Sequence, residues 1–102
     1  MSGFKHLSVN ELTHISAESN DIQIVDIRDS ASFTAGHIEN STNLTNENLA
    51  QFISGADMDK PLVVVCYHGM SSQSAASYLN EQGFDDVYSL DGGYSAWSLA
   101  HS

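Results

Sequence analysis

The sequence predicts an α/β fold, in which a largely parallel sheet is covered by helices. Short β-branched runs alternate with helix-like segments along the chain, and this alternation is typical of βαβ units. One run, residues 62–66, is apolar at every position, as in a strand that is buried on both faces of a parallel sheet. The chain has 102 residues, which fits one hydrophobic core. We therefore expect a single domain over residues 1–102.

A helix over residues 9–17 and a strand over residues 22–27 are the first elements expected. Ser8 and Glu11 have the spacing of a capping box, in which the hydroxyl and the carboxylate bind free amides at a helix start. The strand segment is rich in isoleucine and valine, whose branched side chains favour extended structure.

Shorter elements are expected in the middle of the chain. A short helix should end at residue 35, and a brief strand should cover residues 42–44. A second helix should bury Leu49 and Phe52, before a turn-rich stretch that ends at Pro61. Helix N-caps are mostly serine, threonine, aspartate or asparagine. The candidate caps are Asp29 or Ser30 for the first helix, and Thr45 or Asn46 for the second.

The second half of the chain is expected to contain two strands and two helices. The apolar strand over residues 62–66 leads through a loop into a helix over residues 71–82. A strand over residues 87–90 and a glycine-containing turn follow. The last helix covers residues 94–99, and we expect its Trp97 to pack inward.

The charge balance excludes two classes of partner. There are 13 acidic side chains against 3 basic ones, which gives a net charge of -10. Such a surface repels phosphate backbones and anionic lipid head groups, so we expect no nucleic acid and no membrane partner. The longest apolar run, residues 62–67, is far shorter than the ~20 residues that span a bilayer. The N-terminus lacks the apolar stretch of a signal peptide, and we expect a cytoplasmic protein.

Cys66 is the only cysteine, so no internal disulfide can form. The five histidines show no ligand spacing, and we expect no metal site. A lone cysteine in a reducing cytoplasm is more often a small buried hydrophobe than a functional group. The residues around Cys66 therefore decide which role it has.

The segment that follows Cys66 favours a reactive thiolate. Cys66 lies at the carboxyl end of the most apolar strand, where open α/β sheets bind their ligands. Gly69 permits a tight turn before the next helix, so consecutive amides can point at an anion. Such sites lower the pKa of a cysteine and produce a nucleophile at neutral pH. The side chains of His68, Ser71 and Ser72 could assist, or could be a solvated imidazole and helix caps; the sequence leaves both open.

Three motifs, in this order along the chain, resemble the rhodanese family over essentially its whole length. They are VDIR at residues 25–28 with Phe33 and the GHI of residues 36–38, CYHGMSS at residues 66–72, and LDGGYSAW at residues 90–97. The resemblance implies a five-stranded, mostly parallel sheet with helices on both faces. It also implies a cysteine that takes sulfane sulfur from a donor, holds it as a persulfide and passes it to a thiophilic acceptor.

The resemblance also assigns the site residues. Cys66 would be the nucleophile in ping-pong covalent catalysis. The residues that supply backbone amides to cradle the sulfur would be Tyr67, His68, Gly69, Met70 and Ser71. Thiosulfate is the expected small-molecule donor, and cyanide, a dithiol or a thioredoxin-like protein the expected acceptor. No cofactor is implied, and we expect a monomer or a weak homodimer.

The other motif residues are expected to be structural. Asp26 and Arg28 lie two residues apart at a strand end, so their side chains share a direction and can form an ion pair. His37 is expected to bond to backbone within a turn. Gly92 and Gly93 should serve backbone conformation and close packing beside the site.

The loop after Cys66 contains no arginine or lysine, although many rhodaneses have one there to attract thiosulfate. Binding of a dianion would then depend on amides and on the helix dipole. We therefore expect weak affinity for thiosulfate.

Two other functions compete with a thiosulfate sulfurtransferase. One is a rhodanese-like persulfide carrier or sensor module that serves a protein partner. The other is a cysteine-dependent phosphatase or arsenate reductase, in which five residues separate the cysteine from an arginine that clamps the oxyanion. Ser72 occupies that position here, so the sequence favours sulfur transfer.

Overall fold

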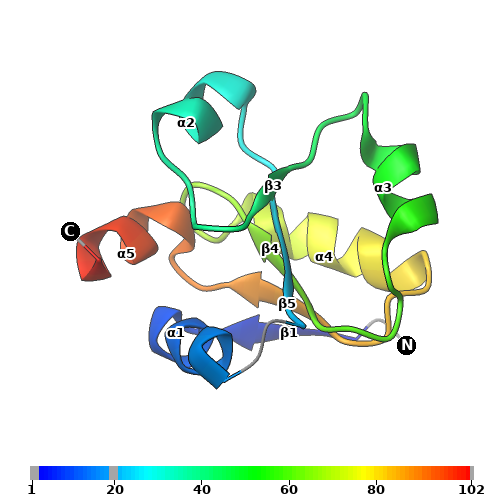
Figure 1. The fold of residues 1–102 in the computed structure, drawn as a ribbon, viewed down its shortest axis with the longest axis horizontal. Coiled ribbons are helices and arrows are strands. Elements are labelled where there is room, and N and C mark those ends of the chain that lie inside the picture. The colour runs from blue at the N-terminus through cyan, green and yellow to red at the C-terminus, as the bar shows by residue number, and fades with distance from the viewer. Residues whose placement is uncertain (1–2, 19–20, 102) are drawn as a thin grey trace.

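A computed structural model describes residues 3–18 and 21–101, and within these ranges it contains five strands and five helices (Figure 1). The strands pair in parallel in the order β1-β5-β4-β2-β3. They are β1 (Phe4–Leu7), β2 (Gln23–Asp26), β3 (Thr42–Asn43), β4 (Leu62–Val65) and β5 (Val87–Leu90). The helices are α1 (Val9–Glu18), α2 (Ser30–Ala35), α3 (Leu49–Gly55), α4 (Ser71–Glu81) and α5 (Gly93–Ala100). The predicted α/β fold with a parallel sheet is confirmed.

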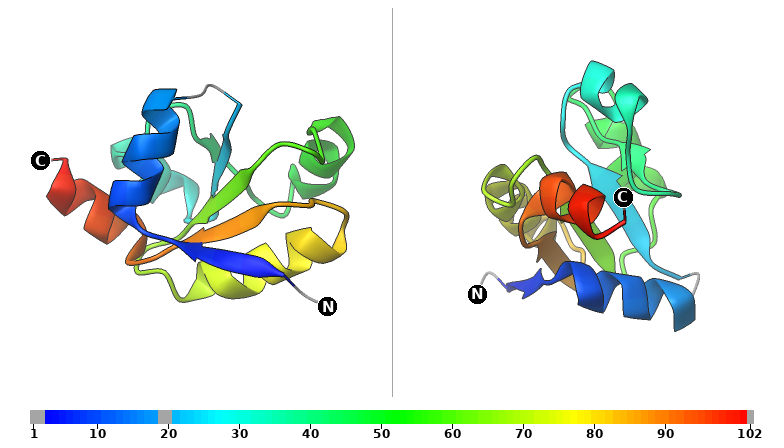
Figure 2. Two further views of the ribbon diagram at one scale, coloured as in Figure 1. Left: turned by 90° about the horizontal axis from the view of Figure 1, so that it is seen from below. Right: turned by 90° about the vertical axis from the view of Figure 1, so that its left-hand side faces the viewer.

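Helices cover both faces of the sheet, and β4 lies at its centre (Figure 2). All four residues of β4 are fully buried. Leu62 and Val64 pack on the side of α3 and α4, whereas Val63 and Val65 pack on the side of α1 and α5. Trp97 of α5 packs against this second cluster, as expected. The continuous apolar run of β4 therefore reflects burial on two faces.

The element that sequence reasoning missed is β1. It lies at the edge of the sheet and pairs with β5, with Phe4 opposite Val87. Lys5 and His6 are exposed and only Leu7 is buried, so the segment lacks the apolar alternation by which a strand is recognised. Polar side chains on an edge strand also oppose pairing with another molecule.

The capping box at the start of α1 is formed as predicted. The Ser8 amide donates to the Glu11 carboxylate at 2.9 Å, and the Glu11 amide donates to the Ser8 hydroxyl at 3.1 Å. At α2, the cap is Asp29 and not Ser30, because the Asp29 carboxylate accepts from the Ser32 amide at 3.0 Å.

The predicted start of α3 at Thr45 or Asn46 is wrong. Residues 46–48 form a turn, and the helix begins only at Leu49. Within this turn the Asn48 side-chain oxygen accepts from the Thr45 amide at 2.7 Å. The local hydrogen bond of an asparagine side chain here competes with the helix and delays its start.

Because all strands are parallel, the carboxyl ends of β2, β4 and β5 lie at one edge of the sheet, and the loops that follow them meet there. This edge carries Cys66, which directly follows β4. In the described parts of the chain, no helix combines the length and the apolar character needed to cross a membrane.

Candidate active site

Cys66 lies between the end of β4 and the loop of residues 67–70, which leads into α4. The cysteine is free and only 3% exposed. Its position is set by the buried strand before it and by the helix start after it. A thiol is thus held at the edge of the sheet where the loops converge.

Two amides and one hydroxyl group surround the sulfur of Cys66. The Gly69 amide lies 3.1 Å from Sγ and the Ser72 amide 3.3 Å from it. The Ser72 hydroxyl oxygen also lies 3.3 Å from Sγ. All three groups can donate to a sulfur anion, so the loop and the first turn of α4 form a cradle for negative charge.

The cradle changes the pKa of the Cys66 thiol in two opposed ways. Burial is the largest single influence and raises the pKa. Hydrogen bonds from the Ser72 hydroxyl and from the amides of Ser72, Gly69 and His68 lower it, and together they outweigh burial. The pKa of Cys66 therefore lies below its ordinary value, which favours the thiolate.

Gly69 gives the loop its shape. Its φ of +87° lies in the region that favours glycine. A Cβ atom at this position would also lie only 2.7 Å from the Gly92 amide nitrogen. The Gln73 side chain donates to the Gly69 carbonyl at 2.9 Å and fixes the peptide from the other side. A side chain at residue 69 would displace the amide that bonds to Sγ.

The start of α5 is hydrogen-bonded to the backbone of Cys66 and of the loop. The Tyr94 amide donates to the Cys66 carbonyl at 2.8 Å, and the Ser95 amide donates to the Tyr67 carbonyl at 3.0 Å. Gly93, with a φ of +59°, has the Cys66 carbonyl oxygen directly against it, so a Cβ atom does not fit there. As predicted, this glycine serves close packing beside the site.

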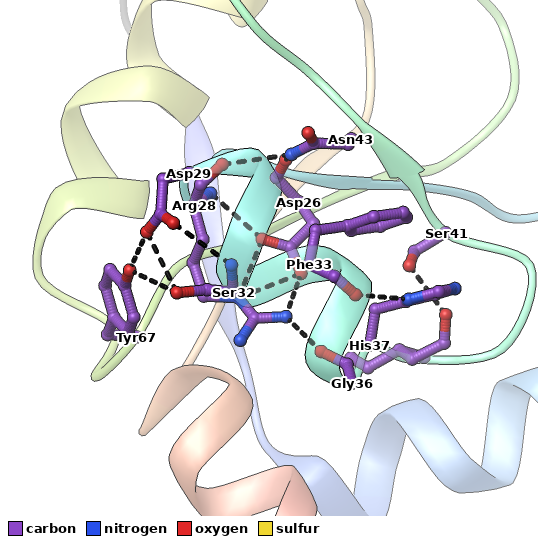
Figure 3. A network of polar contacts seen from close by, with 11 residues as sticks. Asp26, Arg28, Asp29, Ser32, Phe33, Gly36, His37, Ser41, Asn43 and Tyr67 are labelled. Carbon is purple, nitrogen blue, oxygen red and sulfur yellow. Dashed lines mark hydrogen bonds and ion pairs between the residues drawn. The ribbon is translucent and has the colours of Figure 1, made fainter.

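Tyr67 links the rim of the loop to α2. Its hydroxyl donates to the Asp29 carboxylate and lies 2.8 Å from the Ser32 hydroxyl (Figure 3). The bond from Tyr67 is the largest of the influences that lower the pKa of Asp29 from 3.8 to about 2. The other rim side chains, His68 and Met70, are exposed.

The Asp26–Arg28 ion pair is formed as predicted (Figure 3). Arg28 Nη2 lies 2.7 Å from Asp26 Oδ2, and the same nitrogen donates to the Gly36 carbonyl at 2.7 Å. The Arg28 side chain is 4% exposed. It is therefore a brace between loops and is not free to attract an anion.

His37 also has the structural place expected of it. Its Nδ1 donates to the Phe33 carbonyl at 2.7 Å, and the two rings stack with centroids 3.8 Å apart (Figure 3). This turn histidine belongs to the end of α2 and not to the donors around Sγ.

Two serines lie at the site: sequence reasoning left the role of Ser72 open and missed Ser89. Ser72 places both its amide and its hydroxyl next to Sγ, although it is not among the five loop residues expected to form the cradle. Ser89 of β5 lies 2.7 Å from the Ser72 hydroxyl, and both serines are fully buried. The signal for Ser89 is its place in a strand, because it shares a face with the buried Val87.

Two open clefts flank this edge of the sheet. One, of about 400 Å³, has Asp29, Leu49 and Tyr78 in its walls. The other, of about 370 Å³, is lined by Tyr67, Tyr94 and other residues of the loop and α5. The Asp29–Tyr67 hydrogen bond joins a wall of one cleft to a wall of the other. No group of three or more histidine, cysteine or acidic side chains in the described ranges could hold a metal ion.

Known proteins similar to this chain share both its sequence and its fold. The thiosulfate sulfurtransferase GlpE of Shewanella oneidensis is 68% identical over 102 residues, the full length of both chains. A rhodanese-like domain protein of Staphylococcus aureus has a TM-score of 0.81 and 26% identity, over 92% of this chain and 91% of its own.

A third similar protein has a different description. It is a Rhodopseudomonas palustris protein of unknown function, described as a possible tyrosine phosphatase. Its TM-score is 0.82 and its identity 28%, over 97% of this chain and 83% of its own. Residues 8–100 of the present chain match the family called Rhodanese-like domain. The chain therefore belongs to the rhodanese family.

Proposed function

We propose that this chain is a thiosulfate sulfurtransferase, with Cys66 as the nucleophile that carries the sulfur. The observation that carries the proposal is the cradle of two amides and one hydroxyl group around a buried thiol at a strand end. The full-length similarity to a thiosulfate sulfurtransferase supports the choice of substrate. We treat residues 1–102 as one rhodanese domain.

In the first half-reaction the Cys66 thiolate attacks the outer sulfur of thiosulfate. The sulfur–sulfur bond of thiosulfate breaks, and sulfite leaves with the bonding electron pair. Cys66 then carries the transferred sulfur as a persulfide. The reaction needs no metal or organic cofactor. Cys66 is the nucleophile, the donor carries its own leaving group, and the loop amides stabilise the negative charge.

In the second half-reaction a thiophilic acceptor attacks the outer sulfur of the persulfide. The bond to Sγ breaks, its electron pair returns to Cys66, and the acceptor leaves with the sulfur. With cyanide the product is thiocyanate. With a dithiol, the acceptor becomes a persulfide that its second thiol can discharge. Negative charge returns to the same cradle in each cycle.

Several loop amides stabilise this negative charge. The Gly69 amide bonds to Sγ directly, and the His68 amide contributes to lowering the thiol pKa. The loop around the transferred sulfur, which is the outer atom of the persulfide, is completed by Tyr67, Met70 and Ser71. In this proposal the cradle serves both the thiolate and the persulfide.

Donor affinity should be weak. The loop contains neither lysine nor arginine, and the nearby Arg28 is buried and bound to Asp26. Attraction of a dianion then depends on amides and the start of α4, against a net charge of -10. The acceptor meets a rim in which Tyr67 is 46% and Met70 75% exposed. Such a rim suits a small nucleophile or a thioredoxin-like dithiol protein. We place the enzyme in the cytoplasm, where a free thiol stays reduced.

The phosphatase alternative lacks its main catalytic group. A phosphatase of this fold clamps phosphate oxygens with an arginine at the position of Ser72, and Ser72 is fully buried and bonded to Ser89. A persulfide carrier uses the same Cys66 chemistry and differs only in needing a dedicated protein acceptor. Turnover with cyanide separates the carrier from the enzyme.

Intact mass spectrometry tests the proposal. Thiosulfate should add the mass of one sulfur atom to the wild-type protein, and cyanide should remove it. Cys66→Ser should stay folded, gain no sulfur and show no turnover. Thiocyanate formation by folded Cys66→Ser would exclude the covalent mechanism. Hydrolysis of an aryl phosphate by wild type, lost in Cys66→Ser, would favour the phosphatase.

A further inference from the structure

Ser89 is a buried hydroxyl in an apolar layer. Its side chain is fully buried on the same face of β5 as Val87. Val87 packs there against Ala76 and Leu79 of α4. A buried hydroxyl is tolerated when it has a hydrogen-bond partner. For Ser89 the partner is Ser72, whose hydroxyl oxygen lies 2.7 Å away.

Ser89 is thereby connected to the sulfur of Cys66 through one intermediate. Ser72 Oγ lies 2.7 Å from Ser89 Oγ and 3.3 Å from Cys66 Sγ. The three atoms form a chain from the buried face of β5 to the cradle. The chain joins two elements, because Ser72 belongs to α4 and Ser89 to β5.

The protons in this chain have two arrangements. A thiol can donate to Ser72, which then donates to Ser89. A thiolate has no proton to give, so Ser72 must donate to Sγ, and Ser89 is then free to donate to Ser72. In this second arrangement both hydroxyl dipoles point toward the sulfur anion, and each bond strengthens the other.

Formation of the persulfide lowers the negative charge on Sγ. When Cys66 carries a second sulfur, the negative charge lies mainly on the outer atom, and Sγ accepts a hydrogen bond only weakly. When the sulfur leaves, the charge returns to Sγ. A donor aimed at Sγ therefore stabilises the departing thiolate more than the persulfide before it.

On the basis of the proposed function, we propose that Ser89 is a positioning residue for sulfur release: its hydroxyl holds the Ser72 proton toward Sγ and so stabilises Cys66 as the leaving group. In this step the acceptor forms a bond to the outer sulfur, the bond to Sγ breaks, and the electron pair goes to Sγ. Both hydroxyl protons stay in place, so the step needs no further reactant.

The assignment predicts opposite effects on the two half-reactions. A thiolate that accepts weaker hydrogen bonds is a poorer leaving group but a stronger nucleophile. At a pH above the thiol pKa, Ser89→Ala should therefore discharge its persulfide about three- to tenfold more slowly, as for the loss of one ordinary hydrogen bond. Its loading by thiosulfate should be as fast as in wild type, or faster. A general disturbance of the loop would slow both steps.

Single-turnover measurements test this asymmetry. Loading is followed by sulfite release, and discharge by thiocyanate formation from preloaded protein and cyanide. The matched pair is Ser89→Thr and Ser89→Val, which have the same shape and differ in the hydroxyl. Ser89→Thr should discharge faster than Ser89→Val, even if the added methyl group disturbs packing in both or if Ser89→Ala does not fold.

Two failures can be distinguished. Equal discharge rates in wild type and Ser89→Ala, or in the Thr and Val variants, would overturn the role of Ser89 alone. A wild-type protein that takes no sulfur from thiosulfate would overturn the proposed function and the release step with it. The pH dependence of iodoacetamide alkylation adds a readout without sulfur transfer, since loss of the Ser89 hydroxyl should raise the thiol pKa. An unchanged pKa would contradict the proposal.

Discussion

The guanidinium carbon of Arg28 lies 4.1 Å from the centroid of the Tyr94 ring. The amide of Tyr94 in turn donates to the carbonyl of Cys66 at 2.8 Å. The ion pair at the end of β2 is thus connected, through one aromatic residue, to the backbone of the proposed nucleophile. A change at the ion pair can therefore reach the site through Tyr94.

The first prediction concerns this ion pair. Asp26→Ala leaves the buried Arg28 charge without its partner, and removal of one member of a buried pair costs about 3–5 kcal/mol. Urea unfolding measures this loss. The control is the double variant Asp26→Ala with Arg28→Met, which leaves no buried charge and should be more stable than Asp26→Ala alone. A double variant that is less stable than the single one would contradict this view of the pair.

A second prediction compares two loop residues. Gly69→Val should reduce kcat/KM for sulfur transfer by about 100-fold or more, the usual effect of losing one amide donor to a developing charge. His68→Ala should have a much smaller effect, since the amide of that residue remains. Gly55→Val is the matched control, because a Cβ atom at Gly55 contacts nothing within 4 Å. A larger loss in His68→Ala than in Gly69→Val would assign the main role to the imidazole.

The third prediction concerns acid stability. The pKa of Asp29 is about 2 in the folded protein, below its ordinary 3.8. The Tyr67–Asp29 bond should therefore stabilise the fold above about pH 4, and this contribution should be lost as the pH falls through about 2. Tyr67→Phe should lower the free energy of unfolding at neutral pH, but not below about pH 2. Tyr78→Phe, at another exposed tyrosine, should show no such difference. A Tyr67→Phe effect that persists unchanged at pH 2 would argue against the bond.

A fourth prediction concerns the affinity for the donor. Ser71→Arg places a cation on the exposed first residue of α4. An exposed pair of opposite charges contributes about 0.2–1 kcal/mol, so the KM for thiosulfate should fall by up to about fivefold. High salt should remove the gain. Ser74→Arg, exposed on the same helix, is the control and should have a smaller effect. An equal gain in both variants would show that the net charge alone limits binding.

The sequence predicted those features of the fold that depend on residues close together in the chain. The four-residue β4 is recognisable because it is apolar throughout, and the Ser8–Glu11 box because both partners lie within one turn. The Asp26–Arg28 pair follows from two positions that lie two residues apart at the end of β2. In each case the interacting groups are close neighbours in the chain.

The relationships that could not be predicted join distant segments. Tyr67 and Asp29 are 38 residues apart, and Ser72 and Ser89 are 17 apart. No periodicity relates such positions, so only the packing of α4 against β5 and of the loop against α2 brings them together. The edge strand β1 was missed because its pairing partner, and not its own pattern, makes it a strand.

The pairing of β1 with β5 means that the sheet can be completed only after all of its strands have been synthesised. Of the five strands in the described residues, β1 is translated first and β5, with which it pairs, is translated last. Contacts so distant along the chain close slowly, since most of the backbone must be ordered before they form. On the ribosome β1 should therefore stay without its pairing partner until β5 emerges. Lys5 and His6, exposed on that strand, keep it from pairing with other chains in the meantime.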